Sequence, residues 1–208
     1  MIHDPTHLFE GEAGPRMLKA AKITSVISYP PITSIFVFAA LSTKCDDFAT
    51  GAIVYAVCLL FAVILPFIET MYISVKTNNT DGDIVRKEDR AVPLALGVLC
   101  YIGGIIALKL IDAPNEIVVM MICYTAVTAF ILLVSFRWKI SIHACGLAGP
   151  GAILSAVFWP WGLLVFVPIP WICACRYYQK KHTPAQLVAG FACGLAITLA
   201  IMYMAGML

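Results

Sequence analysis

The side chains best suited to chemistry lie around His182, where a basic turn leads into the last long apolar segment. Thr183, Pro184 and Gln186 have the pattern of a capping box with a first-turn proline, which predicts that a helix begins directly after His182. The N-terminus of such a helix favours an anion, and Arg176 and two lysines lie just upstream. His182 could therefore hold or attack a phosphate. The alternative is a transmembrane helix that starts with a good cap and interfacial basic residues.

A second histidine has a similar setting. Ser141 can cap a helix that starts after it, which leaves His143 in the first turn, close to Arg137 and Lys139. The alternative for His143 is a packing residue that is hydrogen-bonded across a helix bundle. Both histidines are thus predicted at helix starts beside cations, which indicates a candidate site for phosphoryl transfer.

A third polar stretch, TNNTDGDIVRKEDRAVP, places Arg86, Lys87 and Arg90 beside four carboxylates. Three cations within five residues could clamp the oxygens of a phosphate, because arginine offers planar, bidentate donors. The alternative is a solvated loop of mixed charge.

The composition indicates the medium in which these residues must be positioned. With 61% hydrophobic and 12% charged residues and a mean hydropathy of +0.91, the chain has the character of a polytopic membrane protein. We divide it into a polar N-terminal arm, residues 1–22, and a single transmembrane domain, residues 23–208. The arm lacks the pattern of a cleavable signal peptide. The expected partner is a lipid bilayer, and nucleic acid is not expected.

Metal and disulfide chemistry are not predicted. His3 and His7 in the arm have a spacing that could bind a metal, but we interpret them as part of a solvated tail. The eight cysteines lie mostly in apolar runs and behave there as small hydrophobes, so no disulfide framework is predicted. Cys173 and Cys175 are too weak a pair to indicate a metal site. We therefore expect no metal and no cofactor.

Apolar runs of about 20 residues, the length that crosses a hydrocarbon core, predict an all-α transmembrane helix bundle of about seven spans, or six at the least. Pro30 and Pro31 are expected to interrupt the first span. The sixth span is expected to be kinked at Pro168 and Pro170 or extended through Tyr178. The runs are Ile23 to Leu41, Gly51 to Val75, Val92 to Ile111, Ile117 to Phe136, Ile140 to Phe158, Trp161 to Cys175 and Pro184 to Met204.

Seven spans place the three polar segments at one membrane face, because each follows an even-numbered span. The N-terminus lies at the same face by this parity. Glycines between residues 146 and 151, together with Gly190 and Gly194, are typical of close helix packing.

The spacing of these residues resembles the type-2 phosphatidic acid phosphatases, integral membrane enzymes that dephosphorylate lipid phosphates without a metal. The third motif of that family, an arginine, five residues, a histidine and three residues before an aspartate, aligns with Arg176, His182 and Gln186. In the second motif Ser141 and His143 match, with isoleucines in place of proline and glycine.

The first motif of that family matches less closely. Arg90 fits its arginine, Asp83 stands where a lysine is expected, and the proline comes late at Pro93. Arg86 or Lys87 could supply the missing charge. The resemblance spans roughly Arg86 to Gly194.

The resemblance implies a role for each matched residue. His182 would attack phosphorus to give a phosphohistidine that water hydrolyses, and His143 would protonate the leaving lipid alkoxide. Arg90, Arg176 and either Arg86 or Lys87 would hold the phosphoryl oxygens, with Ser141 beside them. The implied substrate is a lipid phosphate monoester of phospholipid metabolism, and a polyprenyl diphosphate is the second choice.

The sequence departs from that family where an aspartate should orient the nucleophilic histidine. Gln186 stands there, and no acidic residue follows Glu116. Gln186 or a backbone carbonyl could orient the ring, or a carboxylate such as Asp83 or Glu88 could cross over from the first loop. We prefer the capping role for Gln186 itself.

Two other classes of protein fit parts of the sequence. An intramembrane prenyltransferase would use Asn78, Asp81, Asp83 and Arg90 for magnesium and diphosphate, but it needs a second aspartate-rich loop that this sequence lacks. A membrane protein that binds a phosphate lipid without turnover, or a transporter, would use the polar loops only as interfacial charge.

The basic residues also predict an orientation. Twelve of the fourteen lysines and arginines belong to the face with the polar segments, and only Lys44 and Lys109 belong to the other. The positive-inside rule then places that face in the cytoplasm, in a bacterial inner membrane by our interpretation.

Overall fold

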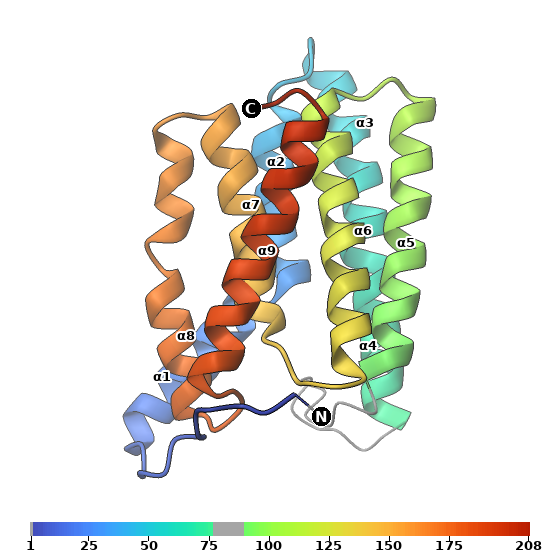
Figure 1. The fold of residues 1–208 in the computed structure, drawn as a ribbon. Coiled ribbons are helices and arrows are strands. Elements are labelled where there is room, and N and C mark those ends of the chain that lie inside the picture. The colour runs from blue at the N-terminus through green and yellow to red at the C-terminus, as the bar shows by residue number, and fades with distance from the viewer. Residues whose placement is uncertain (1, 77–89) are drawn as a thin grey trace.

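The computed structural model describes residues 2–76 and 90–208, and this part of the chain forms a bundle of helices without strands (Figure 1). The predicted all-α transmembrane bundle is therefore confirmed. The helices in chain order are α1 (Pro15–Ile27), α2 (Pro30–Ser42), α3 (Phe48–Leu59), a π-helical turn (Leu60–Ile64), α4 (Leu65–Lys76), α5 (Ala91–Leu110), α6 (Asn115–Ser135), α7 (Ile142–Val157), a 3₁₀ helix (Trp161–Phe166), α8 (Ile169–Tyr178) and α9 (Pro184–Met204).

Six helical units of the described chain qualify as membrane spans if the bent first pair counts as one. The pair α1 and α2 is bent by 51°. The fifth predicted span, α7, has 16 residues, about 24 Å at 1.5 Å per residue, and is shorter than a hydrocarbon core. The five unbent spans are Phe48–Ile73, Ala91–Leu110, Asn115–Ser135, Trp161–Tyr178 and Pro184–Met204.

The break in the first span lies where the two prolines predicted it. Pro30 is the first residue of α2, and Tyr29 before it has an extended backbone, because a residue that precedes proline disfavours the helical conformation. The helix before the break begins at Pro15, so the boundary assigned at residue 22 falls inside α1. The sixth span extends through Tyr178, as expected.

Helix α7 lies in the middle of the bundle and starts inside it. The connection from α6 rises into the bundle before α7 begins (Figure 1). Every residue from 143 to 154 is buried, which is the pattern of a helix surrounded by other helices. The early part of the predicted span Ile140 to Phe158 is thus a non-helical approach, and this approach shortens α7.

Glycines allow α7 and α9 to pack closely, as the sequence predicted. A Cβ atom at Gly194 would lie 2.6 Å from the Cys145 carbonyl oxygen, and one at Gly190 would lie 2.8 Å from the Ser141 carbonyl oxygen. Only glycine fits at such approaches between two backbones. The first turns of α7 and α9 are therefore held against each other.

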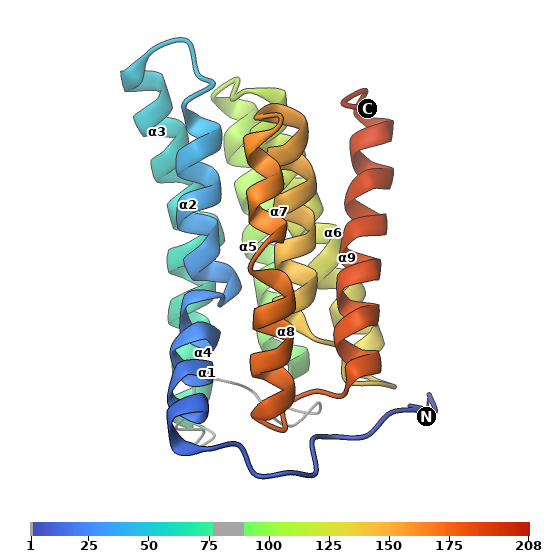
Figure 2. The same ribbon diagram turned by 90° about the vertical axis from the view of Figure 1, so that its left-hand side faces the viewer.

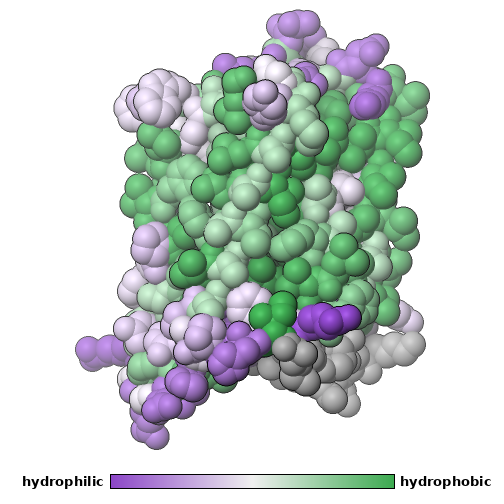
Figure 3. Space-filling view, in the orientation of Figure 1, coloured by the Kyte–Doolittle hydropathy of each residue, from purple (hydrophilic) through white to green (hydrophobic). Residues whose placement is uncertain are grey.

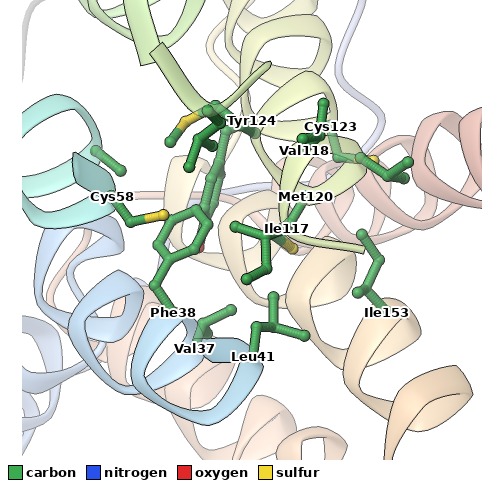
Figure 4. Close-up of a cluster of buried hydrophobic side chains, with 14 of the residues drawn as sticks. Val37, Phe38, Leu41, Cys58, Ile117, Val118, Met120, Cys123, Tyr124 and Ile153 are labelled. Carbon is green, nitrogen blue, oxygen red and sulfur yellow. The ribbon is translucent and has the colours of Figure 1, made fainter. Parts of the chain in front are cut away.

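Apolar side chains lie both in the interior of the bundle and on its outer surface. Phe38, Leu41, Ile117 and Ile153 belong to a buried cluster between α2, α6 and α7 (Figure 4). The face of the bundle shown in Figure 3 is also apolar over a wide band, with polar residues collected at its two ends. All eight cysteines are free. The band fits the hydrocarbon core of a bilayer.

One end of the bundle collects the predicted polar segments. The N-terminal arm, the connection between α6 and α7 and the turn between α8 and α9 lie at the lower end, and the C-terminus lies at the upper end (Figures 1 and 2). The parity prediction is confirmed for these segments. The segment with Arg86 and Lys87 lies outside the described residues.

Candidate functional site

The turn between α8 and α9 places His182. Helix α8 ends at Tyr178, and Lys180 adopts a positive φ of 57°. The N–H of Lys181 then donates to the Arg176 carbonyl over 3.2 Å, which reverses the chain. His182 follows directly and is 1% exposed.

The predicted capping box begins α9. Thr183 Oγ1 accepts from the Gln186 N–H over 3.3 Å, and Gln186 Oε1 accepts from the Thr183 N–H over 3.3 Å. Gln186 Oε1 also lies 3.2 Å from His182 Nδ1. Gln186 therefore makes both contacts that were treated as alternatives: it caps the helix and it holds the histidine ring.

These contacts define the state of the His182 ring. The Thr183 N–H can only donate, so the Gln186 atom that faces it must be the amide oxygen. That oxygen can only accept, so His182 Nδ1 must carry a hydrogen. In a neutral ring the lone pair is then on Nε2, the state that a nitrogen nucleophile requires.

Ser141 joins the starts of α7 and α9. Its side chain caps α7 by accepting from the Ala144 N–H over 3.4 Å, as predicted, and it is fully buried. Its own N–H donates to the Gln186 carbonyl over 3.3 Å. The cluster of His182, Gln186 and Ser141 is thus held together by direct hydrogen bonds.

His143 lies in the first turn of α7 and faces α1. Its Nε2 lies 3.1 Å from the Ser25 carbonyl oxygen. Because a carbonyl oxygen can only accept, Nε2 carries a hydrogen. Arg176 Nη1 donates to the hydroxyl of the same Ser25 over 3.3 Å, and Arg176 is 2% exposed. Ser25 therefore brings two of the predicted site residues together.

His143 and Arg176 line a cavity of about 380 Å³ between α1, α4, α7 and α8. Lys22 and Lys181 also line it, and its described lining holds no carboxylate. Its lining also includes apolar side chains, among them Phe67 of α4. The cavity thus combines basic and apolar side chains.

Arg90 is not part of this cavity. It is 2% exposed, and its Nη1 donates to the Ile140 carbonyl over 3.2 Å. It lines a separate hollow of about 110 Å³, which shares Tyr29 and Thr70 with the larger cavity. His182 does not line either of these spaces. The predicted residues therefore form three neighbouring groups around the segment from Ile140 to His143.

Among the cavity residues that were not predicted from the sequence are Lys22, Ser25 and Gln179. Gln179 Nε2 donates to the Ser25 hydroxyl over 3.0 Å. A hydroxyl about one turn before the proline break was the available signal for Ser25. Its partners are 118 and 151 residues away in the chain, so the contact itself could not be inferred.

The described residues contain no group of three or more His, Cys, Asp or Glu side chains that could hold a metal ion. Comparison of the chain with protein-family models, with curated proteins and with solved structures gives no match. Assignment of a function therefore depends on the chemistry of these residues and on their spacing.

Proposed function

We propose that this protein is a membrane enzyme that removes phosphate from a lipid phosphate monoester through a phosphohistidine at His182. The observation that carries the proposal is the cavity whose lining combines His143, Arg176 and two lysines with apolar side chains. A lipid phosphate likewise combines an anionic head with a hydrocarbon body. The spacing of Arg176, His182 and Gln186, which resembles the type-2 phosphatidic acid phosphatases, supports the same chemistry.

The reaction has two displacements at phosphorus. His182 Nε2 attacks, the bond from phosphorus to the lipid oxygen breaks, and His143 gives its proton to the departing alkoxide. Water then gives a proton to His143 and attacks the phosphohistidine, the bond from phosphorus to His182 Nε2 breaks, and inorganic phosphate is released. Such transfer depends mainly on positioning and on charge stabilisation. Arg176 and the cavity lysines would stabilise the phosphoryl charge, and Ser141, Arg90 and either Arg86 or Lys87 are proposed to assist.

A polyprenyl diphosphate is the second proposed substrate. Lys22, Arg176 and Lys181 at one cavity provide three cations, which suits the higher charge of a diphosphate. A monoester needs fewer cations. An assay of phosphate release from both substrates decides between them.

A second candidate function is the binding of a phosphate lipid without turnover. The specific observation that favours it is the burial of His182, which is 1% exposed and does not line the cavity. Catalysis requires that a phosphorus atom reach His182 Nε2. A binding protein needs only the cavity.

The test is phosphate release by the detergent-purified protein from a panel of lipid monophosphates and diphosphates, with excess chelator present. We expect release from a monophosphate by the wild type. We expect no release by His182→Ala, and a loss of about 10²–10⁴-fold in His143→Ala, the usual contribution of a general acid. His7→Ala is the matched control, because His7 is exposed on the arm.

The outcomes separate the candidates. Release that His182→Ala retains would contradict a nucleophilic role for His182. Binding of the lipids without any release would support the second candidate instead.

We also propose that the end of the bundle with the candidate site faces the cytoplasm of a bacterial cell. The excess of lysine and arginine at that end supports this orientation. It makes lipid biosynthesis, rather than the recycling of polyprenyl carriers at the outer face, the context of the reaction.

A further inference from the structure

The N-terminal arm packs against the turn that holds His182. In Figures 1 and 2 the arm runs beneath α8 and α9. The ring of Phe9 packs edge-on against Tyr177 and Tyr178, with centroid distances of 5.4 and 5.0 Å. Beyond Phe9, Asp4 and Thr6 reach the first turn of α9. The arm therefore contacts the chain on both sides of His182.

Asp4 brings a carboxylate to the capping box. Its Oδ2 accepts from the Thr183 hydroxyl over 2.6 Å. Its Oδ1 accepts from the N–H and the hydroxyl of Thr6 over 2.9 and 2.6 Å. The Thr6 hydroxyl oxygen in turn accepts from the Ala185 N–H over 3.2 Å. Asp4 and Thr6 together satisfy donors at the start of α9.

The charge on Asp4 is consistent with these contacts. Partial burial raises the pKa of Asp4, but the hydrogen bonds from Thr183 and Thr6 outweigh this effect and leave the pKa below its ordinary value. Asp4 is therefore ionised at neutral pH, and its contact with Thr183 is a charge-assisted hydrogen bond.

The capping box of α9 links Asp4 to the histidine ring. The single hydroxyl hydrogen of Thr183 points to Asp4, so the Thr183 oxygen presents lone pairs to the Gln186 N–H. Gln186 then presents its Oε1 to the Thr183 N–H and to His182 Nδ1. The Gln186 group that meets the Thr183 hydroxyl is its backbone N–H, so Asp4 acts on the ring through the first turn of α9, which carries the Gln186 side chain.

We propose that Asp4 is a positioning residue for His182, whose carboxylate acts through Thr183 and Gln186 to keep the hydrogen on Nδ1 and the lone pair on Nε2. A catalytic base or nucleophile is commonly oriented by such a third group. The catalytic consequence rests on the proposed function of His182. This proposal takes the carboxylate from the N-terminal arm. Asp83 and Glu88 of the first loop, which were named among the alternatives, lie outside the described residues.

The test compares Asp4→Ala with Asp4→Asn, which keeps an acceptor for the Thr183 hydroxyl, and with Glu10→Gln, which removes an exposed carboxylate from the same arm. Hydrolysis of dioctanoyl phosphatidic acid gives kcat and KM. We expect kcat to fall about 10- to 100-fold in Asp4→Ala with KM nearly unchanged, the size of effect that misplacement of a reacting group produces. Asp4→Asn should retain more activity than Asp4→Ala, and Glu10→Gln should match the wild type.

A second readout does not depend on turnover. Nitrogen NMR of histidine-labelled protein distinguishes the two ring tautomers, and the His182 signals are assigned by their loss in His182→Ala. We expect the form with hydrogen on Nδ1 in the wild type and a mixture of tautomers in Asp4→Ala. If Asp4→Ala lowers only the melting temperature and leaves the His182 tautomer and kcat unchanged, the positioning role is overturned.

The two readouts separate this inference from the proposed function. A wild type that releases no phosphate, but whose His182 tautomer responds to Asp4→Ala, would refute the phosphatase and retain the positioning role. A wild type that releases phosphate at the same rate as Asp4→Ala, with the same tautomer, would retain the phosphatase and refute the positioning role.

Discussion

At the scale of single residues, one oxygen atom of Gln186 contacts both the N-cap of α9 and the ring of His182. This atom, Oε1, accepts from the Thr183 N–H, which starts α9, and lies 3.2 Å from His182 Nδ1. Helix capping and orientation of the ring therefore depend on the same side chain. A substitution at this position should change both stability and turnover.

We expect Gln186→Ala to lower the stability of the protein by about 1 kcal/mol, the usual effect of losing a capping interaction. Its kcat should also fall, because His182 loses its acceptor. Gln186→Glu keeps an oxygen for both donors and should retain activity. Thermal unfolding and phosphate release check these outcomes. A Gln186→Ala variant that is less stable but has the wild-type kcat would limit Gln186 to capping.

Local chemistry explains which contacts could be predicted from the sequence. The capping box of α9 and the Ser141 cap of α7 involve residues within four positions, so residue types and spacing were sufficient. Asp4 and Thr183 are 179 residues apart, and nothing in the local sequence of either indicates the other. Arg90 lies in a different hollow from Arg176 because its guanidinium meets the Ile140 carbonyl instead.

At the scale of elements, the position of α7 determines where His143 lies. A connection that enters the bundle before the helix begins puts the first turn of α7 at the cavity wall and beside the first turn of α9. Run length and hydropathy predicted the segment, but they cannot show that its first residues are non-helical. Close packing against α9 then fixes the two helix starts relative to each other.

Gly194→Ala tests this packing. The new methyl group would approach the Cys145 carbonyl oxygen to 2.6 Å, and forcing such a contact typically costs about 1–3 kcal/mol. Gly97→Ala is the matched control, since its methyl group would meet only Thr128 Cγ2 at 3.9 Å. Gly97→Ala should be neutral or stabilising by up to about 1 kcal/mol. Thermal unfolding in detergent measures both, and equal stability of the two variants would contradict the close approach.

The attachment of the arm should depend on pH. The pKa of Asp4 is lower when the arm is docked than when it is free, so docking is stabilised above the ordinary carboxyl pKa and is lost as pH falls through the lowered value. Pepsin cleavage between Leu8 and Phe9 reports release of the arm. The wild type should be cut more slowly than Asp4→Ala at pH ~5, and this difference should shrink as the pH falls through the lowered pKa of Asp4. A constant ratio of rates would contradict a role for the Asp4 charge.

At the scale of the whole molecule, an apolar band separates two polar ends, and the candidate site lies at one of them. The number of spans before each polar segment predicted this arrangement. The prediction requires only that each apolar segment crosses the bundle. It does not require each segment to be a full-length helix, so it holds although α7 is short and the first span is bent.

Reporter fusions at Leu208 test the orientation of the molecule. With the site in the cytoplasm, the C-terminus lies outside, because the two are at opposite ends of the bundle. Alkaline phosphatase fused at the C-terminus should be active, and green fluorescent protein fused there should be dark. The reverse pattern would place the site at the outer face and would contradict the orientation argued from basic residues.

Transfer of phosphate to His182 is the most direct test of the central claim. The wild-type protein is mixed with phosphatidic acid that carries a radiolabelled phosphate, quenched in base, in which phosphohistidine survives, and digested for mass spectrometry. We predict label on His182 and none in His182→Ala. Release of phosphate with label on another residue, or with no labelled protein at any time, would contradict a phosphohistidine at His182.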